Sequence, residues 1–177
     1  SDGTLLTVKL RKGVKWHDGQ PFTAKDVIFT WQTLMNPKVS AFSTVGFDQI
    51  ASMTAADDLT LTIKMKQAYA PIFVVLADIF IVPEHILEKS ADINKDEFNT
   101  RRPVGTGPFK FAEWAAGDHI TLEANPAYHG PGPFLDRLIF KYIPDLTVLF
   151  TQFKTGEIDI TGIQGIPVDL YPEAKTL

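Results

Sequence analysis

The sequence predicts a mixed α/β (α+β) protein, in which strand-like and helix-like segments follow one another along 177 residues. Two kinds of pattern carry this prediction. Some short runs alternate apolar and polar residues, as strands with one buried face do, and others repeat apolar residues at helical spacing behind a capping residue. With 45% hydrophobic and 21% charged residues, the chain can bury a sizeable core. No internal repeat divides it.

The first strand and the clearest helix lie near the N-terminus. Residues 6–10 alternate apolar and polar side chains and predict a strand that Gly13 follows. Thr23 and Asp26 form a near capping box, and the run from Val27 to Met35 has helical spacing. Asn36-Pro37 then ends the predicted helix.

The next segments are a strand, an ambiguous apolar run, a short helix and a linker. Residues 59–66 alternate and predict an antiparallel strand with one exposed face. Residues 71–77 fit a buried helix or a buried strand, which periodicity cannot separate. Pro83 is placed to open a short helix over 83–89, and the polar stretch 90–102 is the best candidate for a linker.

The C-terminal part predicts a hairpin and then a strand, helix, strand sequence. Its arms are residues 109–111 and 120–122, joined by a turn at 115–118. A strand over 138–143, a helix from Asp145 through Phe153 and a strand over 157–160 follow.

Composition excludes several classes of function. The net charge is −4 and no basic run tracks a phosphate backbone, so nucleic acid is not an expected partner. The absence of cysteine excludes disulfides, thiolate nucleophiles and cysteine zinc sites. The four histidines are scattered at positions 17, 85, 119 and 129, so we expect no metal and no cofactor. The longest apolar run, 72–77, is far shorter than the roughly 18 residues of a membrane helix.

Candidate chemical groups are few, and each has a simpler structural interpretation. Trp16-His17-Asp18-Gly19 and Gly105-Thr106-Gly107 are both typical of turns. Glu113 and Glu123 lie on opposite arms of the hairpin and could face each other as an acid and a base, but exposed strand charges explain them as well. Phe42, Phe47 and the Trp16/Trp31 pair could line an apolar cleft or belong to the core. With no catalytic residue predicted, binding is favoured over catalysis.

Four stretches are more specific than these physical patterns. Residues 6–31, LTVKLRKGVKWHDGQPFTAKDVIFTW, resemble the signature segment of bacterial extracellular solute-binding protein family 5. Residues 105–114, then 122–128, then 140–145 with 156–159, are similar to later blocks of that family in the same order. The family comprises the oligopeptide, dipeptide and nickel-binding receptors of ABC importers.

This resemblance implies a fold of the periplasmic-binding-protein type, class II with an extra small lobe. Family members are much longer, so the chain is expected to be a fragment. Residues 1–82 would be the small extra lobe without its N-terminal strands, and residues 83–177 part of the first ligand-binding lobe, with the boundary between 81 and 104. Truncated sheet edges would then favour self-association.

The resemblance also implies a function without chemistry. The intact protein would be the periplasmic or extracytoplasmic substrate-binding component of an ABC importer, which captures peptides or a related small solute and delivers it to a membrane permease. Phe42 matches a region where some members place an aromatic residue against the ligand, and the fragment alone would not be competent to bind. The alternatives are a hydrolase that uses Glu113 and Glu123, and a free-standing interaction module.

Overall fold

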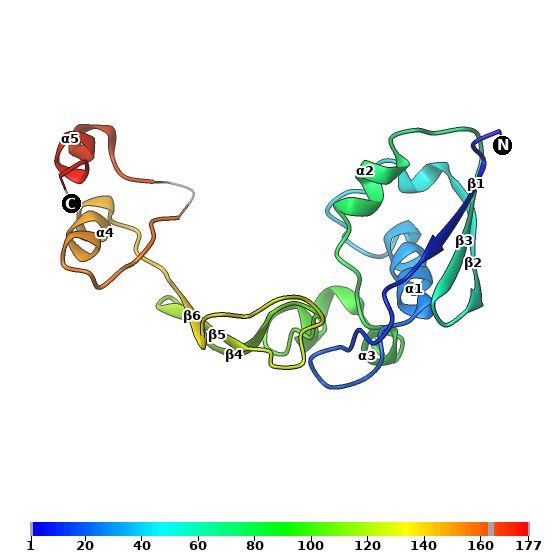
Figure 1. Cartoon of the computed structure of the whole chain (residues 1–177), viewed down its shortest axis with the longest axis horizontal. Helices are drawn as coiled ribbons and strands as arrows, with labels where there is room; N and C mark the ends of the chain where they lie inside the picture. The colour runs from blue at the N-terminus through cyan, green and yellow to red at the C-terminus, as the bar shows by residue number, and fades with distance from the viewer. Residues whose placement is uncertain (1, 163–164, 177) are drawn as a thin grey trace. The chain divides into compact units, whose positions relative to one another are not determined.

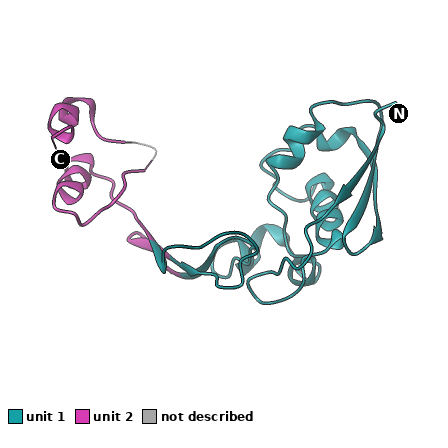
Figure 2. Cartoon of the chain, viewed as in Figure 1, with its two compact units in different colours: residues 1–112, 122–138 teal, residues 113–121, 139–177 magenta. Residues whose placement is uncertain are grey.

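The structure is a computed structural model that describes residues 2–162 and 165–176, and it divides into two compact units (Figure 2). Unit 1 comprises residues 1–112 and 122–138, and unit 2 comprises residues 113–121 and 139–177. Both helices and antiparallel strands occur along the chain, which confirms the predicted α+β class (Figure 1). In the described part of the chain no helix is both long enough and apolar enough to cross a membrane.

Unit 1 begins with an antiparallel sheet of three strands in the order β1-β3-β2. β1 is Leu5–Lys9, β2 is Ile50–Asp57 and β3 is Thr60–Met65. β3 is central, with Leu6 of β1 opposite Ile63 and Met53 of β2 opposite the same residue. The buried side chains of β3 alternate along it, as its sequence predicts.

β2 was not predicted from the sequence, and its composition explains why. It contains small and polar residues, and only Ile50 and Met53 are buried. Two register irregularities, between Ile50 and Ser52 and between Ala55 and Asp57, interrupt the alternation on which strand prediction depends.

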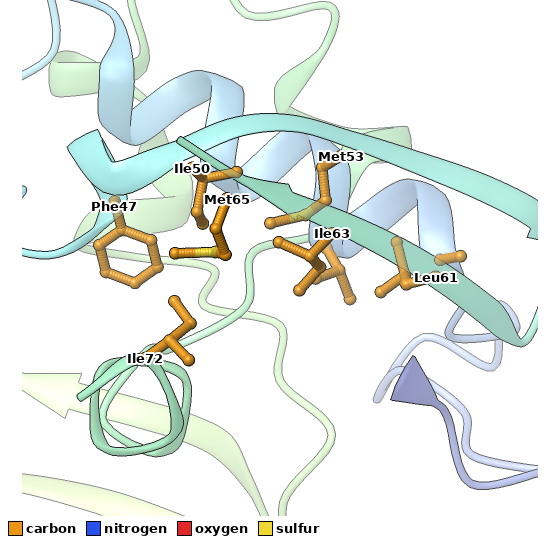
Figure 3. Close-up of a cluster of buried hydrophobic side chains, with 9 residues drawn as sticks. Phe47, Ile50, Met53, Leu61, Ile63, Met65 and Ile72 are labelled. Carbon is orange, nitrogen blue, oxygen red and sulfur yellow. The ribbon is translucent and has the colours of Figure 1, made fainter. Parts of the chain in front are cut away.

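The first helix covers this sheet and begins at the predicted cap. α1 spans Ala24–Met35, and the Thr23 side chain and Asp26 complete a capping box. α1 packs against β2. Figure 3 shows the core that results, in which Met53, Ile63 and Met65 of the sheet lie with Phe47 and Ile72 from the segments that flank it. This burial of apolar side chains is the main stabilisation of unit 1.

The carboxylate of Asp26 joins α1 to a later part of the chain. It is 3% exposed. One oxygen accepts from the amide of Thr23 at 2.8 Å and the other accepts from the amide of Glu84 at 3.0 Å. Thr30, one turn further along α1, donates its hydroxyl proton to the Asp26 carbonyl at 2.7 Å and accepts from the amide of Val82 at 3.0 Å. Residues 82–84 are therefore fixed on the flank of α1.

The ambiguous run 71–77 is a helix, α2, with bounds Ile72–Ala77. Only Ile72 is buried, while Phe73 and Val74 are exposed. The short helix predicted after Pro83 is α3, Glu84–Leu87. The polar stretch 90–102 contains two 3-10 turns, Ile93–Lys95 and Glu97–Asn99.

The predicted boundary between two lobes, at 81–104, stays a prediction. This stretch lies within unit 1, where helix α1 holds residues 82–84. The compact units describe packing among these 177 residues, which is a different property from the division of a longer receptor into lobes.

The predicted hairpin forms the start of a second sheet, with the order β4-β5-β6. β4 is Phe109–Ala115, β5 is His119–Ala124 and β6 is Arg137–Lys141. Gly117, with φ of +80°, lies in the turn between β4 and β5, where the amide of Asp118 donates to the carbonyl of Ala115. Helix α4, Leu146–Lys154, begins at Asp145, whose side chain accepts from the amides of Thr147 and Val148. The short helix α5 spans Tyr171–Ala174.

The strand predicted over residues 157–160 is wrong. The amides of Glu157 and Ile158 donate to the carbonyl of Gln152 at 2.9 Å and 3.3 Å, so this segment turns back on the end of α4. A strand is stabilised by a neighbouring strand, and within the ranges described above none pairs with these residues. The alternation of apolar and polar residues over 157–160 was therefore not sufficient to form a strand.

Candidate functional site

Phe42, the one predicted ligand contact, lies in the loop that follows α1. Its side chain is fully exposed, and Val45 in the same loop is also exposed. The two interpretations of Phe42 were a ligand contact and a core position. Full exposure excludes the core position within this chain, whereas Phe47, the other aromatic considered there, is buried.

Both ends of this loop contact other segments of unit 1. On one side the Asn94 side chain accepts from the amide of Ser40 at 2.7 Å and donates to the carbonyl of Lys38 at 2.8 Å. On the other side Gly46 has a φ of +84°, and a Cβ there would lie 2.5 Å from Val75 of α2. The loop thus presents an exposed aromatic ring between a hydrogen-bonded segment and a closely packed glycine.

The two predicted turns, residues 16–19 and 105–107, lie against each other through His17. The His17 amide donates to the carbonyl of Gly105 at 2.8 Å, and the amide of Gly105 donates to His17 Nδ1 at 3.1 Å. His17 Nε2 lies 3.0 Å from the carbonyl oxygen of Gly107. We call these three hydrogen bonds the His17 junction. A Cβ on Gly105 would lie 3.3 Å from the His17 ring, so a side chain there would require the ring to move by a few tenths of an ångström.

Asn125 and Asp18 extend the contacts around the junction. The buried side chain of Asn125 donates to the same Gly107 carbonyl at 3.0 Å. Asp18 lies 2.7 Å from Nε2 of His85 on α3, and His85 also packs edge-on against the buried Trp16 ring. Partial burial acts to raise the pKa of Asp18, but the hydrogen bonds from His85 and from the amide of Gln20 outweigh it, so the pKa is lowered.

Glu113 and Glu123, the carboxylates of the hydrolase alternative, each have a separate basic neighbour. Glu113 lies 3.8 Å from His119, and Glu123 lies 3.8 Å from Arg137. Both glutamate side chains are more than half exposed. Neither therefore occupies the apolar surroundings that a carboxylic acid needs in order to serve as a general acid near neutral pH.

A concave pocket of about 400 Å³ lies within unit 2. Trp114, Ile120, Phe140 and Tyr142 supply its apolar walls, and Asp118, His119 and Lys141 supply polar groups. The sequence prediction did not find this pocket, because its residues come from all three strands of the β4-β5-β6 sheet, from the turn between β4 and β5 and from Tyr142 just after β6. Within the described ranges no group of three or more His, Asp or Glu residues is placed to hold a metal ion.

Comparison with known proteins gives a consistent result. The family model described as bacterial extracellular solute-binding proteins, family 5 Middle, matches residues 1–176. The oligopeptide-binding protein AppA of Bacillus subtilis is 35% identical over 164 residues, which are 91% of this chain and 30% of that protein.

Solved structures of binding proteins also match this chain over most of its length. The structure of Bacillus subtilis AppA in complex with a nonapeptide matches with a TM-score of 0.90 and 34% identity, over 98% of this chain and 34% of that one. The structure of NikZ from Campylobacter jejuni in complex with Ni(L-His) matches with a TM-score of 0.82 and 34% identity, over 89% of this chain and 31% of that one. The structure of the ABC transporter substrate-binding protein CtaP from Listeria monocytogenes matches with a TM-score of 0.82 and 30% identity, over 89% of this chain and 33% of that one. The chain thus spans about a third of the length of the relatives it matches.

Proposed function

The chain belongs to the bacterial extracellular solute-binding proteins, family 5, and we propose that it forms part of a receptor that captures a peptide or a related small solute. The receptor would work outside the cytoplasm and deliver its solute to the membrane permease of an ABC importer. The observation that carries this proposal is the family match over residues 1–176, in register with a solved relative that holds a nonapeptide.

The proposed receptor would act by binding and not by chemistry. The family is one of solute-binding proteins. The carboxylates of the hydrolase alternative are exposed and engaged with separate basic residues, which gives that alternative no support. In the proposed division of the receptor, residues 1–82 belong to a small extra lobe and residues 83–177 to part of the first ligand-binding lobe.

Phe42 is the proposed contact to the solute. An exposed phenylalanine leaves a large apolar surface in water, and covering such a ring with a ligand is favourable. The loop that carries it is held by Asn94 and by the close packing of Gly46, so little conformational entropy would be lost when a ligand binds.

These 177 residues alone would bind the solute poorly. Receptors with two lobes enclose the ligand, and enclosure removes water and strengthens every polar contact inside. A chain that covers about a third of its relatives supplies only one part of such a site.

The proposal is tested in the receptor expressed from the complete reading frame, by calorimetry with a mixture of di- and oligopeptides. Phe42→Ala should weaken the affinity about tenfold, which is about 1.4 kcal/mol. Phe80→Ala is the matched control, because Phe80 is 91% exposed in the same unit and is not a proposed contact. Equal affinities of the two variants would overturn the role of Phe42. Failure of the receptor to bind any peptide or small solute would overturn the proposed function.

The stability of the Phe42 variant separates a lost contact from a lost fold. Because Phe42 is fully exposed, Phe42→Ala should change the free energy of unfolding by less than about 0.5 kcal/mol. Phe47→Ala, which removes a buried ring from the core, should cost about 3 to 5 kcal/mol. Denaturant unfolding of both variants makes this comparison.

A further inference from the structure

We propose that the His17 junction is a pH-sensitive connection, which holds residues 16–19 against residues 105–107 while the imidazole is neutral and loosens when it is protonated. This inference concerns a conformational property of the chain and does not depend on which solute the receptor binds. It rests on the geometry of three hydrogen bonds.

The hydrogen bonds select one tautomer of His17. A carbonyl oxygen can only accept, so Nε2, 3.0 Å from the oxygen of Gly107, must carry the proton and donate. A backbone amide can only donate, so Nδ1, 3.1 Å from the nitrogen of Gly105, must accept. Both contacts are satisfied together only by the neutral ring with its proton on Nε2.

Protonation of the ring removes one of these contacts and leaves the other. A proton on Nδ1 would point at the amide proton of Gly105, so an attractive contact becomes a contact between two donors. The Nε2 bond to Gly107 would persist, and Asn125 also satisfies that carbonyl. The expected change is therefore local to Gly105, which loses its acceptor.

The charged groups that act on His17 are Asp18 on its own loop and Lys110 on β4, and His85 on α3 lies next to Asp18. Asp18 is engaged by His85, which reduces its ability to stabilise a charged His17. Partial burial, the strongest influence, lowers the pKa of His17. The Gly107 carbonyl raises it, Lys110 lowers it and Asp18 raises it, and the balance is a pKa below the ordinary value of 6.5.

The direction of the pH dependence follows from this lowered pKa. The unfolded or opened form takes up a proton near pH 6.5, whereas the closed junction takes it up only at lower pH. The stabilisation is complete above the ordinary pKa, and it is lost as the pH falls through the pKa of the closed junction. As the pH falls from about 6.5 to the pKa of the closed junction, the equilibrium constant for opening should rise about tenfold per pH unit. Below that pKa it should level off.

Nuclear magnetic resonance of the isotopically labelled chain tests this proposal. The ring protons of His17 should titrate with a pKa below about 6.5, and the amide resonance of Gly105 should move with the same midpoint. Amide hydrogen exchange at Gly105, corrected for intrinsic rates, should lose protection about tenfold for each unit by which the measured pKa lies below about 6.5.

Two variants complete the experiment. His17→Gln keeps a donor and an acceptor but does not titrate, so the protection of Gly105 should become independent of pH. His85→Gln removes a neighbouring imidazole and should leave the pH dependence at Gly105 in place. Protection of Gly105 that stays constant while His17 titrates would overturn the proposal, and so would a His17 pKa at or above about 6.5. Both measurements use the unsubstituted chain, so they stand even if a variant does not fold.

Discussion

Gly105 packs closely against the ring of His17, a residue far from it in the sequence. A Cβ at this position would lie 3.3 Å from the His17 ring, while nothing lies within 4 Å of the position a Cβ would take at Gly107. Gly105→Ala should therefore lower the free energy of unfolding by about 1 to 2 kcal/mol relative to Gly107→Ala. Comparing the two alanine variants cancels most of the entropy change that alanine makes in the unfolded chain.

Urea unfolding of the two glycine variants at neutral pH makes the measurement. The difference between them should shrink in a His17→Ala background, because the close contact of the added Cβ is with the histidine ring. Equal stabilities of the two single variants would show that the His17 ring moves aside without cost.

Local turn chemistry predicts part of this region and cannot predict the rest. Asp18 and Gly19, like Gly105 and Gly107, are typical turn residues, and the sequence prediction placed turns at both positions. The hydrogen bond between Gly105 and His17 joins residues 88 positions apart. Nothing in the spacing or type of these residues indicates that pairing, because it is a product of the tertiary fold.

At the scale of elements, Asp26 holds α1 and the start of α3 with one carboxylate. Its two oxygens accept from the amides of Thr23 and Glu84. Asp26→Ala would leave two partly buried amides without this acceptor and would remove a buried side chain, so we expect a loss of about 2 to 4 kcal/mol. Asp92→Ala is the control, since Asp92 caps only a three-residue 3-10 turn at the surface and should cost about 1 kcal/mol or less.

Thermal and denaturant unfolding of the two aspartate variants tests this assignment. A cost of Asp26→Ala no larger than that of Asp92→Ala would mean that water replaces the carboxylate at both amides. It would also mean that the segment 82–84 is held by other contacts.

Elements with a strong local signal were predicted well. The capping residues of α1 and α4 satisfy amides within their own first turn, so the sequence contains the whole interaction. β2 was missed and residues 157–160 were assigned wrongly as a strand, because strand formation depends on a partner strand. The run 71–77 was ambiguous, since helix and strand both tolerate a short apolar segment.

At the scale of the whole molecule, β6 is an outer strand with an unusually apolar surface. In the described sheet it neighbours only β5, and its Ile139 and Phe140, with Tyr142 just beyond, are each more than half exposed. Such a strand favours pairing with another chain. We therefore expect the 177-residue chain to self-associate as its concentration rises, and Phe140→Lys to weaken that association.

Sedimentation velocity over a range of concentrations measures the association. Phe42→Lys is the control, because it introduces the same charge at an exposed phenylalanine outside the described strands. A monomer at all concentrations, or equal effects of the two lysine substitutions, would contradict the role of β6.

The candidate site could be predicted only in part. The family resemblance pointed to Phe42, and the structure places that ring in solvent, on a loop that is hydrogen-bonded to Asn94 at Ser40. The pocket in unit 2 could not be predicted, because its walls come from strands that meet only in the fold. The chain spans about a third of the length of the relatives it matches, so contacts that the proposed receptor makes through its other residues could not be predicted from this sequence.

The most direct test of the receptor assignment is calorimetry of the 177-residue chain and of the receptor from the complete reading frame, each with the same peptide mixture. The complete receptor should bind a peptide or related solute with micromolar or tighter affinity. The chain alone should bind at least about a thousandfold more weakly, which is a loss of about 4 kcal/mol. Equal affinity of the two proteins would contradict the account, because the recognition determinants would then lie within residues 1–177. Absence of binding by the complete receptor would contradict the assignment itself.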